Sequence, residues 1–74
     1  MSMNLIDKKG VKVCEGDYVR SDIDEVGKVK AINNNDFCTV DIHMNGKWVE
    51  SKMNHDAFKR YTKVDLGEIA ERLI

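Results

Sequence analysis

The chain contains two cysteines, Cys14 and Cys38, and two histidines, His43 and His55, whose thiol and imidazole groups could act as a nucleophile–base pair or bind a metal. A thiol and an imidazole cooperate only when they are in hydrogen-bond contact. The alternating segment 37–44 directs Cys38 to one face of a strand and His43 to the other, which removes this pair. Cys14 with His55 stays open from the sequence alone, although an inert, partly buried cysteine is far more common.

The sequence contains no pattern typical of a metal site or of a phosphate-binding loop. The two cysteines and two histidines are spaced too widely for a zinc site. The five glycines stand at separate places, so they form no phosphate-binding loop. We therefore predict no catalytic residue, no metal and no cofactor, and a protein that is not an enzyme.

The most strongly patterned segment is the hairpin 37–52. Residues 37–44 alternate between apolar and polar side chains, and Asn45-Gly46 is typical of a two-residue type I′ turn. The turn sets the register: Met44 pairs with Lys47, His43 with Trp48, Ile42 with Val49, Asp41 with Glu50, Val40 with Ser51 and Thr39 with Lys52. We expect an inner face of Ile42, Val49, Val40 and Met53, and an outer face on which His43 lies opposite Trp48.

Two surfaces are candidates for binding a partner. On the outer face, His43 and Trp48 are expected to form a flat aromatic platform beside Thr39 and Lys52, and each base or aromatic ring stacked on such a platform contributes about 1–3 kcal/mol. The alternative is that the C-terminal helix covers Trp48. The second candidate is the basic segment with Lys59, Arg60 and Lys63 around Tyr61. The alternative is that this segment is an edge strand whose lysines prevent it from pairing with strands of other molecules.

The candidate binding residues must be positioned by secondary structure, and the sequence pattern predicts mostly short strands. Turns are expected at Asp7-Lys8-Lys9-Gly10, Glu15-Gly16-Asp17 and Asn33–Asp36, with strands between them and a bulge at Gly27. One helical turn over 54–60 and a closing strand over 61–64 follow. The C-terminal segment predicts a helix capped by Asp65, with Glu68 completing a capping box and Val64 and Ile69 as a hydrophobic staple. Its apolar stripe is expected to cover an open end of the fold, or alternatively to form a dimer interface; the stripe is Leu66, Ile69, Ala70 and Leu73.

Length and composition describe one folded domain, residues 1–74, with 42% hydrophobic and 34% charged side chains. The net charge of −1 argues against a nonspecific DNA-binding protein, which usually has a basic excess. Acids predominate over residues 17–41 and bases over 47–63. Neither a signal peptide nor an apolar run of about 20 residues is present, so we expect a cytoplasmic protein with reduced thiols and no membrane contact.

Gly16-Asp17-Tyr18-Val19-Arg20, then Val26-Gly27-Lys28-Val29 and Ile32, resemble the opening of KOW- and Tudor-type SH3-like barrels. Asn45-Gly46-Lys47-Trp48-Val49 looks like their next hairpin. The resemblance covers roughly residues 13–53 and implies a mainly β fold: a small SH3-like barrel of about five antiparallel strands with a short C-terminal helix. It also implies binding of nucleic acid, ribonucleoprotein or a protein tail. KOW segments usually have another glycine where this chain has Asp22–Asp24, and the aromatic residues assign no Tudor cage.

Two functions therefore compete. We favour a protein-interaction or inhibitor module that docks on a larger machine, as a bacterial or phage accessory protein does, because the net charge is not basic. In this case the acidic stretch from Asp17 to Glu25 steers the encounter and the hairpin supplies an aromatic anchor. The alternative is a KOW-like module that binds nucleic acid or ribonucleoprotein. A monomer or weak dimer is expected in both cases.

Overall fold

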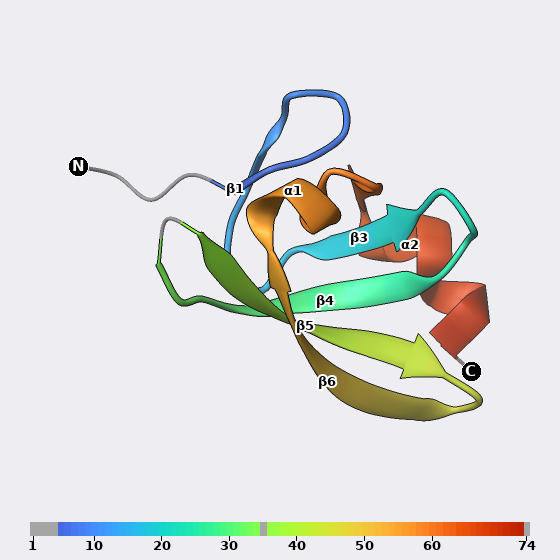
Figure 1. Ribbon diagram of the computed structural model, residues 1–74. Helices are drawn as coiled ribbons and strands as arrows, with labels where there is room; N and C mark the ends of the chain where they lie inside the picture. Colours follow the sequence, from blue (N-terminus) through green and yellow to red (C-terminus); the bar gives the residue numbers. More distant parts are fainter. Residues whose placement is uncertain (1–4, 35, 74) are drawn as a thin grey trace.

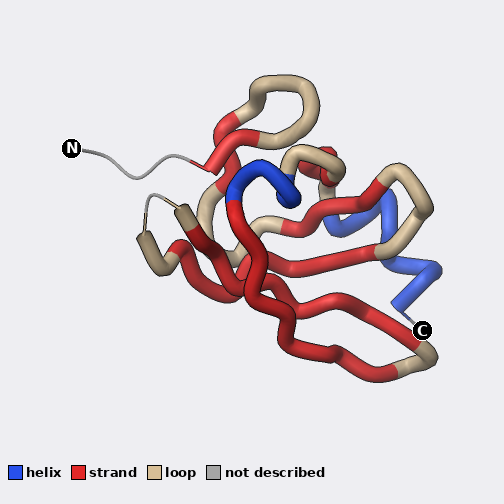
Figure 2. The backbone as a smooth tube through the Cα atoms, viewed as in Figure 1, coloured by secondary structure: helices blue, strands red, loops and turns tan. Residues whose placement is uncertain are grey.

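The computed structural model describes residues 5–34 and 36–73 (Figure 1). Seven strands form two antiparallel sheets, with short helical segments late in the chain (Figure 2). The elements, in chain order, are β1 (Leu5–Ile6), β2 (Lys12–Val13), β3 (Tyr18–Ser21), β4 (Val26–Ile32), β5 (Phe37–Met44), β6 (Lys47–Asn54), α1 (His55–Phe58), β7 (Tyr61–Val64), α2 (Leu66–Ile69) and the 3₁₀ segment η1 (Ala70–Leu73). The predicted mainly β class, with one helical turn before a closing strand, is confirmed.

The main sheet has the strand order β6-β5-β4-β3-β7, so its two edges are β6 and β7 and no ladder between described strands closes it. The β5–β6 hairpin has the predicted register at all six expected pairs, from Met44–Lys47 to Thr39–Lys52. Asn45 and Gly46 have φ angles of 51° and 78°, as a type I′ turn requires. Because a two-residue turn fixes both register and facing, this local pattern was sufficient to assign each paired residue to one face of the hairpin.

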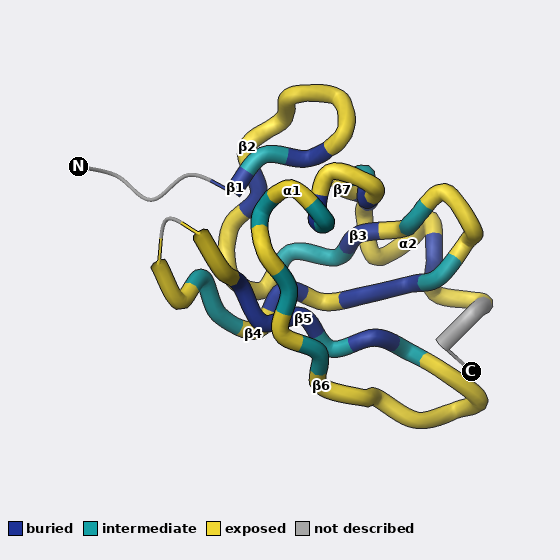
Figure 3. Tube along the Cα trace, in the orientation of Figure 1, coloured by how far each residue is buried: buried dark blue, intermediate teal, exposed yellow. Residues whose placement is uncertain are grey.

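The main core lies on the inner face of this sheet, where Val19, Val29 and Val40 are fully buried beneath Phe58 of α1. Val40 and Ile42 are buried as expected, and Met53 packs against the core. Val49, also expected inside, is instead 48% exposed. The tip of the β5–β6 hairpin extends beyond the core and no described strand crosses over it, which leaves β6 mostly exposed (Figure 3).

A second, smaller core lies on the outer face. Ile69 of α2 is fully buried against Val26 and Val64, with Tyr18 beside them. The predicted staple pair, Val64 and Ile69, is therefore in place. The helix covers this face rather than an open end of the fold, which corrects the sequence prediction. It also explains why Val26 is apolar although it faces away from the main core.

The C-terminal helix departs from the prediction in other ways. It has one α-helical turn before continuing as η1, and Asp65 occupies the N-cap position without a side-chain hydrogen bond. Of the predicted stripe, Ile69 is buried, whereas Leu66 and Ala70 are exposed. The side chain of Leu73 lies outside the described part of the chain.

The predicted bulge exists, but at a different residue. The register between β4 and β5 shifts between Val29 and Ala31, so Lys30 is the extra residue. Gly27 is in regular register, opposite Ile42. A Cβ atom at Gly27 would lie 2.9 Å from Cγ1 of Val40 and 3.4 Å from Cγ2 of Val19. Close packing against the core, rather than a bulge, therefore accounts for this glycine.

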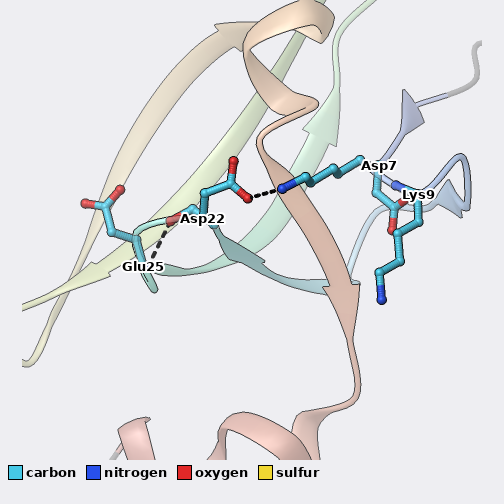
Figure 4. A network of polar contacts seen from close by, with 6 residues as sticks. Asp7, Lys9, Asp22 and Glu25 are labelled. Atoms are coloured by element: carbon cyan, nitrogen blue, oxygen red, sulfur yellow. Dashed lines mark hydrogen bonds and ion pairs between the residues drawn. The ribbon is translucent and has the colours of Figure 1, made fainter.

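The predicted first turn is held by Asp7, whose Oδ1 accepts the backbone N–H groups of Lys9 and Val11, each at 2.8 Å. Its other oxygen, Oδ2, accepts the backbone N–H of Lys63 in β7 at 2.9 Å. The next residue, Lys8, donates its backbone N–H to the carbonyl of Tyr61. Residues 7 and 8 thus occupy the outer edge of β7, and the ammonium of Lys8 reaches Asp22 (Figure 4).

Candidate functional site

Trp48 lies on the outer face of β6, directly opposite His43 of β5, as the hairpin register predicted. The two ring centroids are 5.0 Å apart with an angle of 64° between the planes. The rings meet edge to face, so the expected flat platform is not formed. The indole is 44% exposed, and among the described residues Ile69 of α2 packs with Val26, Val64 and Tyr18. An aromatic anchor held by a neighbouring imidazole is thus accessible at the hairpin tip.

Thr39 and Lys52, predicted beside this pair, lie farther along the same face. Thr39 is only 9% exposed and its hydroxyl donates to the amide oxygen of Asn33 at 2.8 Å. It therefore holds the turn at residue 33 rather than offering a contact. Lys52 extends over the ring of Phe37, with its Nζ 5.3 Å from the ring centroid. Phe37 is 41% exposed, so it adds a second accessible aromatic ring that the sequence prediction did not single out.

Charged residues separate these two aromatic sites. Asp41 and Glu50 face each other across the hairpin, a like-charge pair that is unfavourable in isolation. Lys30, the bulge residue of β4, forms an ion pair with Glu50, and the Lys30 pKa is raised by this hydrogen bond and by the nearby carboxylate charges. The bulge therefore places a cation where the hairpin alone has two anions.

The basic segment does not form a free patch of cations. Lys63 lies 3.3 Å from a carboxylate oxygen of Asp17, and Lys59 lies 3.9 Å from one of Asp56. Arg60 instead lines a groove with Glu25 and Tyr61. The acidic stretch is engaged in the same way, because Lys8 pairs with Asp22 and Arg20 with Asp24. Opposite charges are interleaved across this side of the molecule.

Among the described residues, no hydrogen bond joins a cysteine to a histidine. Cys38 is fully buried, and burial raises the pKa of its thiol to about 11. Cys14 is exposed and lines a hollow with Lys12, Glu15 and neighbours. His55 lines a different hollow, with Asp36 and Phe37. Among residues 5–34 and 36–73, no three His, Cys, Asp or Glu side chains gather as a possible metal site. The same stretches contain no helix long and apolar enough to cross a membrane.

The sequence prediction missed a groove on the inner face. Val49 and Met44, 48% and 45% exposed, lie there beside Ile42, Met53 and Ser51, and Arg60 and Tyr61 form the opposite wall. Strand alternation assigned these apolar residues to the interior. Distance from the turn does not distinguish them, because Ile42, which pairs with Val49, is only 6% exposed. Val49 differs from Ile42 in lying on the edge strand β6, and alternation within the hairpin does not show which strand forms the edge.

Comparison of the chain with protein-family models, curated proteins and solved structures finds no significant match.

Proposed function

We propose that this chain is a non-catalytic protein-binding module that docks on a larger protein through the outer face of the β5–β6 hairpin. The half-exposed indole of Trp48, held edge-on by His43, is the observation that carries the proposal. Tryptophan is among the side chains most enriched at the residues that dominate protein interfaces. Phe37 at the other end of the same face supplies a second apolar contact.

The charges support a protein partner over nucleic acid. Binding to phosphates needs cations that are free to replace counterions. Here Lys30, Lys59 and Lys63 of the candidate surfaces each have an acidic neighbour, and the net charge is −1. Interleaved charges of both signs suit a protein rim, where they select the partner and orient the encounter.

The SH3-like resemblance agrees with this proposal at the level of architecture. Strands β3 to β7 form a single antiparallel sheet, and the helical turn α1 connects β6 to the closing strand β7. The KOW-like alternative, an accessory module for nucleic acid or ribonucleoprotein, uses the same hairpin face with Lys52 in place of the acidic rim. The thiol of Cys38 is fully buried and therefore inaccessible to a substrate, which is consistent with a module that does not catalyse a reaction.

The test compares Trp48→Ala with Leu66→Ala, a control that removes an apolar side chain of similar exposure (50%) from α2. Immobilised wild-type and variant chains are presented to bacterial lysate and the captured proteins are quantified. We expect a protein that wild type and Leu66→Ala retain and that Trp48→Ala loses. With that protein purified, the substitution should raise the Kd at least about tenfold.

Equal capture by all three chains would contradict the proposal. The alternative is tested with RNA and DNA oligomers at low salt, with fluorescence of Trp48 as the readout. Quenching that disappears steeply as salt is added would favour the nucleic-acid module instead.

A further inference from the structure

The two edges of the main sheet differ in whether their backbone groups are occupied. On β7, the carbonyl of Tyr61 accepts the N–H of Lys8, and the N–H of Lys63 donates to the carboxylate of Asp7. Protein sheets commonly cover an edge in this way, because an uncovered edge pairs with other strands. The outer edge of β7 is therefore closed to another strand.

The edge of β6 is open. His55 donates its N–H to the carbonyl of Asp36 at 2.9 Å, which fixes the phase of the β5–β6 ladder. Since hydrogen-bonded pairs alternate with non-hydrogen-bonded pairs, residues 53, 51, 49 and 47 bond to β5. The N–H and C=O groups of Trp48, Glu50 and Lys52 then point away from β5. Since β6 ends the strand order of the described sheet, no other described strand pairs with these groups, and no described backbone group outside the ladder bonds to them.

We propose that β6 pairs antiparallel with β6 of a second copy of this chain, about a two-fold axis that passes through Ser51. In this register Glu50 lies opposite Lys52 of the second copy, and Lys52 lies opposite its Glu50. Directly opposed charges of opposite sign stabilise antiparallel strand pairs. Because both ion pairs come from one sequence, Glu-Ser-Lys, the edge is complementary to itself.

The inner face fits the same register. Val49, 48% exposed, lies opposite Met53 of the second copy, so each groove gains an apolar side chain from its neighbour. Moving the axis toward the hairpin turn, to Glu50 or to Val49, would place Glu50 opposite Glu50 or opposite Trp48, which loses both ion pairs. Moving it the other way, to Lys52, would place Lys52 opposite Lys52 and Glu50 opposite Asn54. Among these axes, only the one at Ser51 opposes charges of opposite sign.

The proposed strand pairing ends at a dimer. An isologous contact about a two-fold axis uses the β6 edge of both copies, and the remaining edges of the two main sheets, both β7, are covered by Asp7 and Lys8. The result is a dimer with a continuous sheet rather than a fibre. The rings of Trp48 and His43 stay on the outer face, so dimerisation does not depend on the proposed function.

The decisive experiment is a cysteine at the axis. Residues opposite each other in a non-hydrogen-bonded antiparallel pair have Cα atoms about 4.5 Å apart, within the range that a disulfide spans. Ser51→Cys is made in a Cys14→Ser background and treated with oxidised glutathione, which accepts the two electrons and two protons of the thiols and leaves as two molecules of reduced glutathione. We expect a covalent dimer of the folded chain.

The matched control is Glu50→Cys in the same background. In the proposed register its two copies are diagonal neighbours about 7–8 Å apart, too far for a disulfide without backbone movement. Faster cross-linking at residue 50 than at residue 51 would overturn the register. No cross-linking at residue 51 would overturn the dimer.

Sedimentation velocity of the untreated chain gives an independent readout. Lys52→Glu would oppose two carboxylates at each of the two former ion pairs and should weaken the dimer at least about tenfold. Adding Glu50→Lys to it should restore dimerisation, since the charges are of opposite sign again. Lys12→Glu, which changes the net charge equally on β2, should have no effect. A wild-type chain that stays monomeric at its highest soluble concentration would refute the proposal. A double variant, Lys52→Glu with Glu50→Lys, that dimerises no more strongly than Lys52→Glu alone would also refute it.

Discussion

The carboxylate of Asp7 accepts the backbone N–H of Lys63, 56 positions later, at 2.9 Å. Asp7 is 3% exposed and also accepts the N–H groups of Lys9 and Val11, so one side chain satisfies three backbone donors. It joins the first turn of the chain to the last strand of the main sheet. The stability of the closing strand β7 should therefore depend on a residue at the other end of the sequence.

Replacing Asp7 by alanine should destabilise the fold by about 2–4 kcal/mol, because three backbone donors lose a charged acceptor and cannot all reach water. Urea unfolding followed by circular dichroism measures this. The control is Asp22→Ala, which removes an exposed carboxylate paired with Lys8 and should cost no more than about 1 kcal/mol. Equal losses in the two variants would show that Asp7 has no special role.

The same carboxylate should make stability depend on pH in the acid range. Burial alone raises the pKa of Asp7, but the N–H donors of Lys63, Val11 and Lys9 outweigh it, and the folded pKa lies below the usual 3.8. A group with a lowered folded pKa contributes stability that is complete above its unfolded pKa and is lost as pH falls through the folded value. The contribution of Asp7 should thus be constant above about pH 5 and decline below about pH 4.

This dependence is isolated by comparing wild type with Asp7→Asn in urea at a series of pH values. The difference in unfolding free energy should shrink as the solution is acidified below about pH 4, since the wild-type carboxyl becomes neutral as well. A difference that is independent of pH from about 7 to about 2 would contradict the assignment.

Sequence pattern predicted the hairpin because its determinants are local. Asn45-Gly46 sets both the turn and the register, and every pair from Met44–Lys47 onward follows. The bond from Asp7 to Lys63 was not predictable in this way, because no local pattern shows which distant backbone group a turn aspartate will meet. The turn itself was predicted from the same residue.

The errors have a common physical origin: alternation tells which face a residue is on, but not what covers that face. Val49 is on the inner face as predicted, yet it is exposed because it lies on the edge strand β6, whereas its partner Ile42 on β5 is buried. Val26 is on the outer face, yet it is buried because Ile69 packs on it. For the candidate site, the pairing of His43 with Trp48 came from register alone, whereas the exposure of the indole depended on where the helix docks.

Gly27 provides a test of the packing argument. Gly27→Ala places a Cβ 2.9 Å from Cγ1 of Val40 in the main core and should cost about 1–3 kcal/mol through overpacking. Gly67→Ala is the matched control, since a Cβ there meets nothing within 4 Å. In helix α2 this change should be neutral or stabilising by up to about 1 kcal/mol. Similar stability changes for both variants, measured by thermal unfolding, would argue against close packing at Gly27.

The two cysteines should differ sharply in reactivity. At about pH 8 a thiol with a pKa of about 11, as for Cys38, is roughly one part in a thousand thiolate, and Cys38 is also fully buried. Labelling of the folded chain with iodoacetamide should therefore modify Cys14 alone. A Cys14→Ser variant should react only when urea unfolds it, as followed by mass spectrometry. Rapid labelling of Cys38 in the folded variant would show that the core is open.

The docking of α2 on the outer face makes a final prediction. Ile69 is fully buried against Val26 and Val64, so Ile69→Ala should cost about 2–4 kcal/mol, through lost burial and the cavity left behind. Leu66→Ala, one turn earlier and 50% exposed, should cost less than about 1 kcal/mol. Urea unfolding separates the two variants, because a helix this short cannot persist without its buried contact. If Ile69→Ala were as stable as Leu66→Ala, the outer face would not be held by this helix, and the surface available beside Trp48 would extend across β4 and β3.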